Sequence, residues 1–451
     1  MTSAHALDLD TPFLSFPASG GCEVSRTIHP SGVRILTEKV PGALSTSLGF
    51  WIAVGSRDED TVAFGSTHFL EHLLFKGTSK RSALDIAVAF DSVGGEHNAL
   101  TAKEHTCYYA KVQDHDVDMA IEILADMIAD SLIDEKEFEV ERQVILEELA
   151  MADDDPSDVA HERLTELVMG EHPLGRPIGG NPGTIRASER SSVVAHYQTY
   201  YRPEELVVTG AGALDHQRVV DAVVKGLESS GWNLGGHQRP QPRRSTREAS
   251  LPIRPQIQVV SKPLEQAVVA LAMPGLVATD PRRHVQGVLS SVLGGGMSSR
   301  LFQEVREKRG LAYSVYSFAS SYADAGMFGM AAGTSPDKVY EVASVLREEF
   351  EQISTSGITA EELARTRGNL AGASALALEN METRMVRLGR SEISTGEFVD
   401  RDEGLRRLET VDLDAVLELA GDLASGPLSA VAVGPVEDGA LEQAVPAVAH
   451  G

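Results

Sequence analysis

The segment His68-Phe69-Leu70-Glu71-His72 constrains the fold of this chain more than any other feature of its sequence. Positions i and i+4 of a helix lie one turn apart on one face, so a helix here directs His68 and His72 toward a single point. Glu71, one residue before the second histidine, is close enough to take a proton from a water bound there. Because H-x-x-E-H is a zinc motif, the segment predicts a helix with two zinc ligands and a general base.

The alternative interpretation is an exposed helix face that carries two histidines with only structural roles. The residues around the motif argue against it, because Leu70, Leu73, Leu74 and Phe75 make this helix apolar. Polar groups within an apolar surface need partners, and a metal ion supplies one.

A hydrolytic zinc site needs a third protein ligand and an open position for water. The acidic segment 134–148 is strongly helical in pattern and contains Glu141 and Glu148, which are seven residues apart and share a face. One of them can bind the metal while the other holds a ligand by hydrogen bonding. For any single glutamate in so acidic a run, an exposed surface is the competing interpretation.

These residues resemble the pitrilysin, insulin-degrading enzyme and mitochondrial processing peptidase family of zinc metallopeptidases, and are closest to its bacterial processing-peptidase-like subunits. In that family the H-x-x-E-H helix is followed by a ligating glutamate within E-R-x-V-I-L-x-E; here Glu141 begins that sequence, and 148 − 72 = 76 residues separate Glu148 from His72. The resemblance covers nearly the whole chain. It implies that His68, His72 and Glu148 bind one Zn²⁺ per chain, with Glu71 as base and Glu141 supporting a ligand.

The segment Gly94 to Tyr109 is similar to the family's G-G-x-x-N-A-x-T-x-x-E-H-T strand. The resemblance implies an open edge strand beside the metal, where Asn98, Ala99 and Thr101 bind substrate. A peptide that adds to a sheet edge is held by backbone hydrogen bonds, which read any sequence. Without the resemblance, the segment predicts only a turn and a strand. We assign no metal to His97 or His105, since isolated histidines near strands are more often hydrogen-bonded structural groups.

The segment Arg306 to Tyr313 resembles an arginine and tyrosine pattern in the second half of the same enzymes. The resemblance implies that Arg306 and Tyr313 are catalytic, gripping substrate and stabilising the oxyanion. A guanidinium and a phenol are suitable donors for that charge if they face the metal. Without the resemblance, we expect Arg306 to be an exposed charged residue on a helix that ends at Gly310.

Composition excludes several classes of protein. The formal net charge of −26 disfavours nucleic acid and anionic membranes as partners and favours basic ligands. There is no run of about 18 apolar residues and no recognisable signal segment, so we expect a cytoplasmic protein without a membrane partner. Cys22 and Cys107 are too few and too scattered to indicate a disulfide framework.

At 451 residues the chain accommodates two domains. The stretch 231–255 has the glycine, proline and arginine content of a linker, and the order of elements is alike on its two sides. We therefore predict an N-terminal extension over 1–20, a catalytic zinc-binding domain over 21–230, a linker over 231–255 and a metal-free second domain over 256–445. The fold class is α+β: two similar domains, each a mainly antiparallel sheet with helices on one face.

The predicted function is a zinc-dependent endopeptidase that cleaves peptides or unfolded segments, with a preference for basic ones, by zinc-activated water and a glutamate base. The resemblance implies that chains of this length work as pairs of subunits, in which the arginine and tyrosine reach the zinc from the other chain. Because both motifs occupy one polypeptide here, it implies a homodimer. Two alternatives remain open: a non-catalytic structural or interaction subunit of the same fold, and a metal-dependent hydrolase with another substrate. The intact H-x-x-E-H motif disfavours the first, and the strand around Asn98 disfavours the second.

Overall fold

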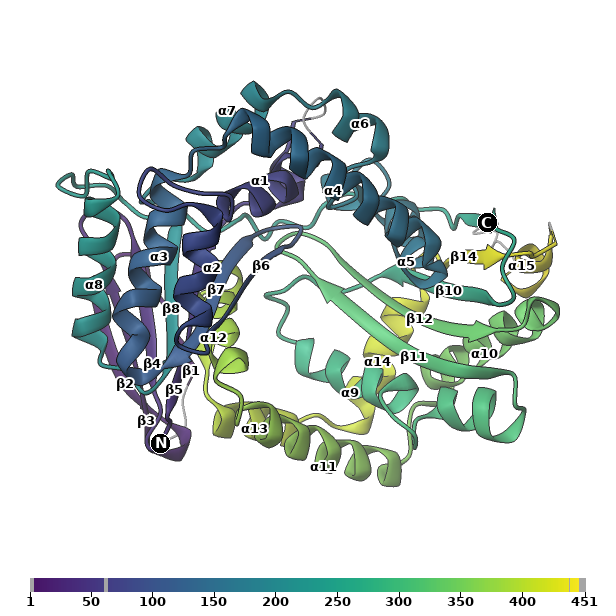
Figure 1. Ribbon diagram of the computed structural model, residues 1–451. Coiled ribbons are helices and arrows are strands. Elements are labelled where there is room, and N and C mark those ends of the chain that lie inside the picture. Colours follow the sequence, from purple (N-terminus) through teal and green to yellow (C-terminus); the bar gives the residue numbers. More distant parts are fainter. Residues whose placement is uncertain (1–3, 61–63, 438, 446–451) are drawn as a thin grey trace. The chain divides into compact units, whose positions relative to one another are not determined.

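The computed structural model describes residues 4–60, 64–437 and 439–445. The chain forms two compact units (Figure 1). Unit 1 comprises Met1–Leu149, Pro177–Arg243 and Ala375–Glu403; unit 2 comprises Ala150–Arg176, Arg244–Ser374 and Gly404–Gly451. Each unit therefore contains a segment from the other half of the sequence.

Within the described residues, unit 1 is built on a seven-stranded sheet in the order β2-β3-β4-β8-β5-β7-β6. The neighbours β4 and β8 are parallel and all other pairs are antiparallel. The strands are β2 (Phe13–Ala18), β3 (Cys22–Ile28), β4 (Arg34–Lys39), β5 (Ser45–Ile52), β6 (Glu96–Thr101), β7 (Thr106–Gln113) and β8 (Leu206–Gly212). Because β6 is last in this order, one of its sides has no neighbouring strand among the described residues.

Alternating residues of β5 and β8 divide the interior of unit 1 into two cores, as the two-residue period of a strand requires. Leu48, Phe50 and Val208 pack on one face of the sheet, whereas Trp51 and Val207 pack on the other. The larger core lies under helices from the first half of the chain, and α3 and α8 run side by side along it (Figure 1). The helices of the first half in unit 1 are α1 (Ser66–Leu74), α2 (Ala83–Asp91), α3 (Val117–Asp130), most of α4 (Glu135–Asp154), α6 (Pro182–Ala187), α7 (Arg190–Tyr200) and α8 (His216–Ser229).

The opposite face of this sheet is covered by α12 (Met381–Arg390), which comes from the second half of the chain. Met385 and Leu388 of α12 are fully buried in the same cluster as Trp51. The short strands β1 (Ala4–Ala6) and β13 (Glu397–Val399) pair beside it. The predicted N-terminal extension is therefore folded into unit 1 from residue 4 onward, and its residues 1–3 lie outside the described part.

Unit 2 contains a five-stranded sheet, counted over the described residues, in the order β11-β12-β10-β14-β9. Its strands are β9 (Ile257–Ser261), β10 (Ala267–Pro274), β11 (Ala312–Ser321), β12 (Gly326–Thr334) and β14 (Ser429–Gly434). Its helices are α5 (Pro156–Met169), α9 (Arg283–Gly294), α10 (Val339–Ser356), α14 (Leu413–Ala424), α15 (Ala440–Ala444), a π-helix (Phe302–Lys308) and most of α11 (Ala360–Ala377) and α13 (Arg401–Glu409). Here α5, from the first half of the chain, covers one face of the sheet and α10 packs on the other.

The two sheets repeat one topology. Read from β4 to β6, the first sheet runs β4-β8-β5-β7-β6, and the second runs β9-β14-β10-β12-β11, with one parallel pair in the same place. The predicted α+β class with two similar, mainly antiparallel domains is thus confirmed. The structure adds that each sheet also carries a helix from the other half of the chain on its second face.

Residues 231–255 contain no helix or strand, and the division between the units falls within them, after Arg243. Arg243 is packed on unit 1, where its guanidinium donates to the carbonyl oxygens of Leu7 and Glu392. Over the described ranges, no helix combines the length and the apolar character needed to cross a membrane.

Candidate metal centre

Helix α1 presents the H-x-x-E-H segment on a firmly anchored scaffold. Phe69, Leu70, Leu73 and Leu74 are fully buried in the main core of unit 1. The helix begins after Gly65, whose φ of +92° is a conformation that favours glycine. The backbone N–H groups of Gly65 and Thr67 donate to the buried carboxylate of Glu59 over 2.8 and 2.7 Å, which satisfies the start of the helix.

Helix α4 supplies the acidic side chains and is tied to α1 at two levels. Phe138 stacks on Phe69, with ring centroids 4.4 Å apart. The loops that follow α1 and precede α4 are also joined, because Leu132 N–H donates to the carbonyl oxygen of Gly77 over 3.1 Å and Thr78 forms a bridge with Ser131. These contacts fix which residues of α4 face the histidines.

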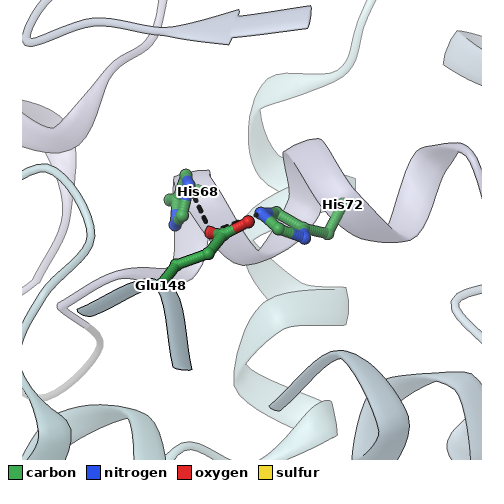
Figure 2. A group of neighbouring side chains, drawn as sticks. All are labelled: His68, His72 and Glu148. Carbon is green, nitrogen blue, oxygen red and sulfur yellow. Dashed lines mark ion pairs between the residues drawn. The ribbon is translucent and has the colours of Figure 1, made fainter. Parts of the chain in front are cut away.

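The structure brings together His68, His72 and Glu148 (Figure 2). One donor atom from each lies within 4.8 Å of the other two. Glu148 Oε2 is 3.3 Å from His72 Nε2 and 3.8 Å from His68 Nε2. Ligand atoms around a tetrahedral zinc, with bonds of about 2.1 Å, lie about 3.4 Å apart. The two nitrogens and one oxygen can therefore hold a zinc ion, and three protein ligands would leave one of its four coordination positions for an exchangeable ligand.

Burial of His68 favours the form of its side chain that binds a metal ion. It lowers the pKa of His68, and the neighbouring His72 lowers that pKa further. A lowered pKa favours the neutral imidazole, which is the form that binds a metal. The Nδ1 atom of His68 is buried and has no hydrogen-bond partner among the described residues, so this ring is held by packing rather than by an acceptor.

His72 is held differently. Its Nδ1 lies 2.9 Å from Glu141 Oε2, and Glu141 Oε1 lies 2.7 Å from Lys76 Nζ. Glu141 is 2% exposed, so this carboxylate is buried between an imidazole and an ammonium group. A carboxylate that accepts from Nδ1–H fixes the tautomer that leaves Nε2 free to bind a metal.

Glu71 lies between the two histidines in sequence and does not belong to the group of donor atoms. Its Oε2 accepts a hydrogen bond of 2.5 Å from the hydroxyl of Thr101, the last residue of β6. A carboxylate that is oriented beside a metal site without ligating the metal is suited to proton transfer.

The predicted substrate-binding residues occupy the edge strand β6. Asn98 is exposed, while Ala99 packs against the core of unit 1 and Thr101 is buried. The backbone N–H of Ala99 donates to Asn98 Oδ1 over 2.8 Å. The strand contacts α1, so β6 and Glu71 lie close together within unit 1.

Arg306 and Tyr313 lie in unit 2, where they contact one another. The guanidinium of Arg306 donates to the backbone carbonyl oxygen of Tyr313 over 2.9 Å and lies 4.6 Å from the centroid of its ring. Tyr313 is 80% exposed. The two residues thus form one surface pair, as a shared role requires, and their role in catalysis remains a prediction.

The sequence did not identify two features of this site. One is Lys76, and the other is the hydrogen bond from the hydroxyl of Thr101 to Glu71. Each contact joins residues that are distant along the chain: Lys76 meets α4, and Thr101 meets α1. Their positions after the motif helix and at the end of β6 were the only available signals.

Comparison with known proteins agrees with this geometry. Residues 34–182 match the family model described as insulinase (peptidase family M16), and residues 189–370 match the one described as peptidase M16 inactive domain. An uncharacterized zinc protease of Streptomyces coelicolor is 46% identical over 92% of this chain and 90% of its own length. An uncharacterized zinc protease of Mycobacterium bovis is 42% identical over 91% and 93%. The crystal structure of a protease from Helicobacter pylori superimposes with a TM-score of 0.82 at 22% identity, over 94% of this chain and 99% of that one.

Together, the donor set, the neighbouring carboxylate and these relatives define a zinc-dependent metalloprotease. The chain belongs to peptidase family M16, which confirms the resemblance seen in the sequence. Its second half, which matches the inactive-domain description, contains no H-x-x-E-H segment.

Proposed function

We propose that the chain is an endopeptidase in which His68, His72 and Glu148 hold the zinc ion and Glu71 is the general base. The observation that supports this most directly is the convergence of the three donor atoms, with the Glu71 carboxylate held separately by Thr101. Bound zinc supplies a Lewis acid that lowers the pKa of a water molecule and polarises the scissile carbonyl.

In this mechanism Glu71 accepts a proton from the attacking water as the water oxygen bonds to the carbonyl carbon. The same carboxyl group then donates that proton to the amide nitrogen as the C–N bond breaks, so the proton balance closes on one residue. Thr101 directs the Glu71 carboxylate, and Glu141 keeps His72 in the required tautomer. Arg306 and Tyr313 donate hydrogen bonds to the developing oxyanion.

We also propose that substrate binds as an added strand on β6, with Asn98, Ala99 and Thr101 along it. The position of β6 at the edge of the sheet formed by the described residues supports this, because backbone groups on its outer side can bond to an extended peptide of any sequence. An added strand must be extended, so short or unfolded segments are the expected substrates. The formal net charge of −26 supports a preference for basic ones.

The proposed assembly is a homodimer that works in the cytoplasm. One polypeptide carries both the metal donors and the Arg306 and Tyr313 pair, which supports two equivalent sites in a pair of identical chains. Both cysteines are buried and unpaired, as is usual for a reducing compartment.

The decisive experiment combines metal analysis with cleavage of an unstructured, lysine-rich peptide. We expect one zinc per chain, and we expect Glu71→Gln to retain the zinc while losing at least about a hundredfold in kcat. Glu147→Gln is the matched control, because Glu147 is an exposed glutamate on α4 beside Glu148. Wild-type cleavage by Glu71→Gln would exclude this mechanism, and an absence of both zinc and cleavage would favour a structural subunit.

The basic preference is tested with two peptides of one length and one cleavable core, flanked either by lysines or by glutamates. We expect a lower KM for the lysine peptide, and a difference that shrinks as salt is raised, because screening weakens long-range attraction. Equal KM values at low salt would remove the preference and leave the peptidase assignment intact.

A further inference from the structure

Lys76 lies two residues beyond the end of α1, where its side chain reaches α4. Its Nζ is 2.7 Å from Glu141 Oε1, while Glu141 Oε2 is 2.9 Å from His72 Nδ1. The side chain of Lys76 is 31% exposed and that of Glu141 is 3% exposed. In the described part of the chain, these are the two partners of the Glu141 carboxylate, one on each oxygen.

The backbone at Lys76 is as fixed as its ammonium group. The N–H of Lys76 donates to the carbonyl oxygen of Leu73 over 3.1 Å, which continues the turn at the end of α1. The next residue, Gly77, accepts from Leu132 just before α4. Both ends of the lysine side chain are therefore set by the packing of α1 against α4, unlike those of a surface lysine.

A buried carboxylate has two requirements here. It needs a compensating charge, because an unpaired buried anion is costly, and it needs a defined rotamer to accept from one ring nitrogen. His72 as a neutral metal ligand provides a hydrogen bond but no charge. Lys76 meets both requirements, since it neutralises Glu141 and holds the oxygen that His72 does not use.

We propose that Lys76 is a positioning residue of the metal centre: it anchors Glu141 so that Glu141 accepts from His72 Nδ1 and presents His72 Nε2 to zinc. This inference rests on the proposed ligand set. Because Lys76 touches none of the three donors, the inference predicts that Lys76 affects zinc affinity only through Glu141.

The test is a double-mutant cycle read out as the zinc dissociation constant, measured by competition with a chelator. Partners of metal ligands are worth about 10- to 100-fold in metal affinity, and we expect Lys76→Met to weaken zinc binding by about 3- to 30-fold. Lys76→Arg, which keeps the charge and a donor, should recover most of that loss. In a Glu141→Gln background, Lys76→Met should change the constant by less than about twofold.

Lys136→Met is the matched control, because Lys136 is an exposed lysine on α4 remote from the donors, and its zinc constant should equal the wild-type value. Unchanged or tighter zinc binding in Lys76→Met would overturn the proposal, as would an equal loss with and without Glu141. If Lys76→Met does not fold, Lys76→Gln and Lys76→Arg are compared in the same two backgrounds. The outcome that defeats only this inference has three parts. The wild-type chain binds zinc, Glu71→Gln loses cleavage, and the effect of Lys76→Met on the zinc constant does not depend on Glu141.

Discussion

Thr101 donates a hydrogen bond of 2.5 Å to Glu71 Oε2, which links the edge strand β6 to the helix that carries the H-x-x-E-H segment. The proposed base is therefore oriented by the same strand on which we propose that substrate binds. In the proposed mechanism, binding of a peptide to the strand and alignment of the base would be coupled through this one hydroxyl.

Removing that hydroxyl without changing side-chain shape should lower catalysis and spare the metal. A hydrogen bond to a charged group is worth about 1.5–3 kcal/mol, so Thr101→Val should reduce kcat by about 10- to 100-fold. Thr101→Ser keeps the donor and should recover most of the rate. Zinc content, measured in parallel, should be unchanged in both variants; a Val variant with wild-type kcat would show that Glu71 needs no orientation by β6.

The sequence predicted the parts of this site whose spacing is local. Two histidines at i and i+4 must share a helix face, and the structure brings both within reach of Glu148. Lys76 could not be found in this way, because its contact with Glu141 depends on how α1 packs against α4. The same holds for the exchange of α5 and α12 between the units, since nothing in a helix's own pattern states which sheet buries it.

Zinc should stabilise unit 1, because the proposed ligands come from two helices that a bound metal would join. At a free zinc concentration 100 times the dissociation constant, the free energy of unfolding should rise by about 2.7 kcal/mol over that of the metal-free chain. Denaturant unfolding followed by tryptophan fluorescence measures this, since Trp51 and Trp232, the two tryptophans of the chain, lie in unit 1. Glu148→Ala should reduce the gain, whereas Glu147→Ala should not. Stoichiometric zinc with no gain in stability would mean that the metal lies elsewhere.

The helix α12 should contribute strongly to the stability of unit 1. Leu388 is fully buried beside Trp51, and a Cβ atom on the neighbouring Gly389 would lie 2.5 Å from the same indole ring. Truncating a buried leucine costs about 2–5 kcal/mol, so Leu388→Ala should lower the free energy of unfolding by that amount. Denaturant unfolding followed by tryptophan fluorescence measures this. Leu376→Ala is the control, because Leu376 is 76% exposed and its loss should cost less than about 0.5 kcal/mol. Equal effects of the two substitutions would contradict the packing described here.

Stability should also fall in mild acid because of His196. Burial lowers the pKa of His196 to about 4, against a partly opposing effect of Asp58 and Asp60. The unfolded chain, with a histidine pKa of about 6.5, takes up the proton first, so the stability associated with neutral His196 is complete above about pH 6.5. It is lost as the pH falls toward 4, by roughly 3 kcal/mol in all.

His196→Gln isolates this effect, because glutamine does not titrate and can still hydrogen-bond to Thr67, whose hydroxyl lies 3.2 Å from His196 Nε2. The difference in unfolding free energy between wild type and variant should change across pH 6.5 to 4 and stay constant above that range. A difference that does not vary with pH would show that the pKa of His196 is the same in the folded and the unfolded chain.

Mixing two variants that we expect to be inactive tests whether Arg306 and Tyr313 act within one chain or on the partner subunit of the proposed homodimer. Arg306→Ala retains Glu71, and Glu71→Gln retains Arg306. If the pair acts on the metal centre of the partner subunit, a mixed dimer contains one site with both intact groups and one site with neither. Random re-association of equal amounts gives mixed dimers half of the time, so about a quarter of the wild-type activity should return.

If Arg306 acts on its own chain, every site in the mixture lacks one group and no activity returns. The measurement is peptide cleavage after the two variants are dissociated, mixed and reassembled, with each variant treated alone as its control. Size-exclusion chromatography with light scattering establishes that the mixture is dimeric, because a monomeric chain cannot complement. The Glu71→Gln chain is mixed either with Arg306→Ala or with a chain that carries both substitutions and so supplies neither group. Recovery of cleavage in the first mixture but not in the second would show that Arg306 acts on the metal centre of the partner subunit.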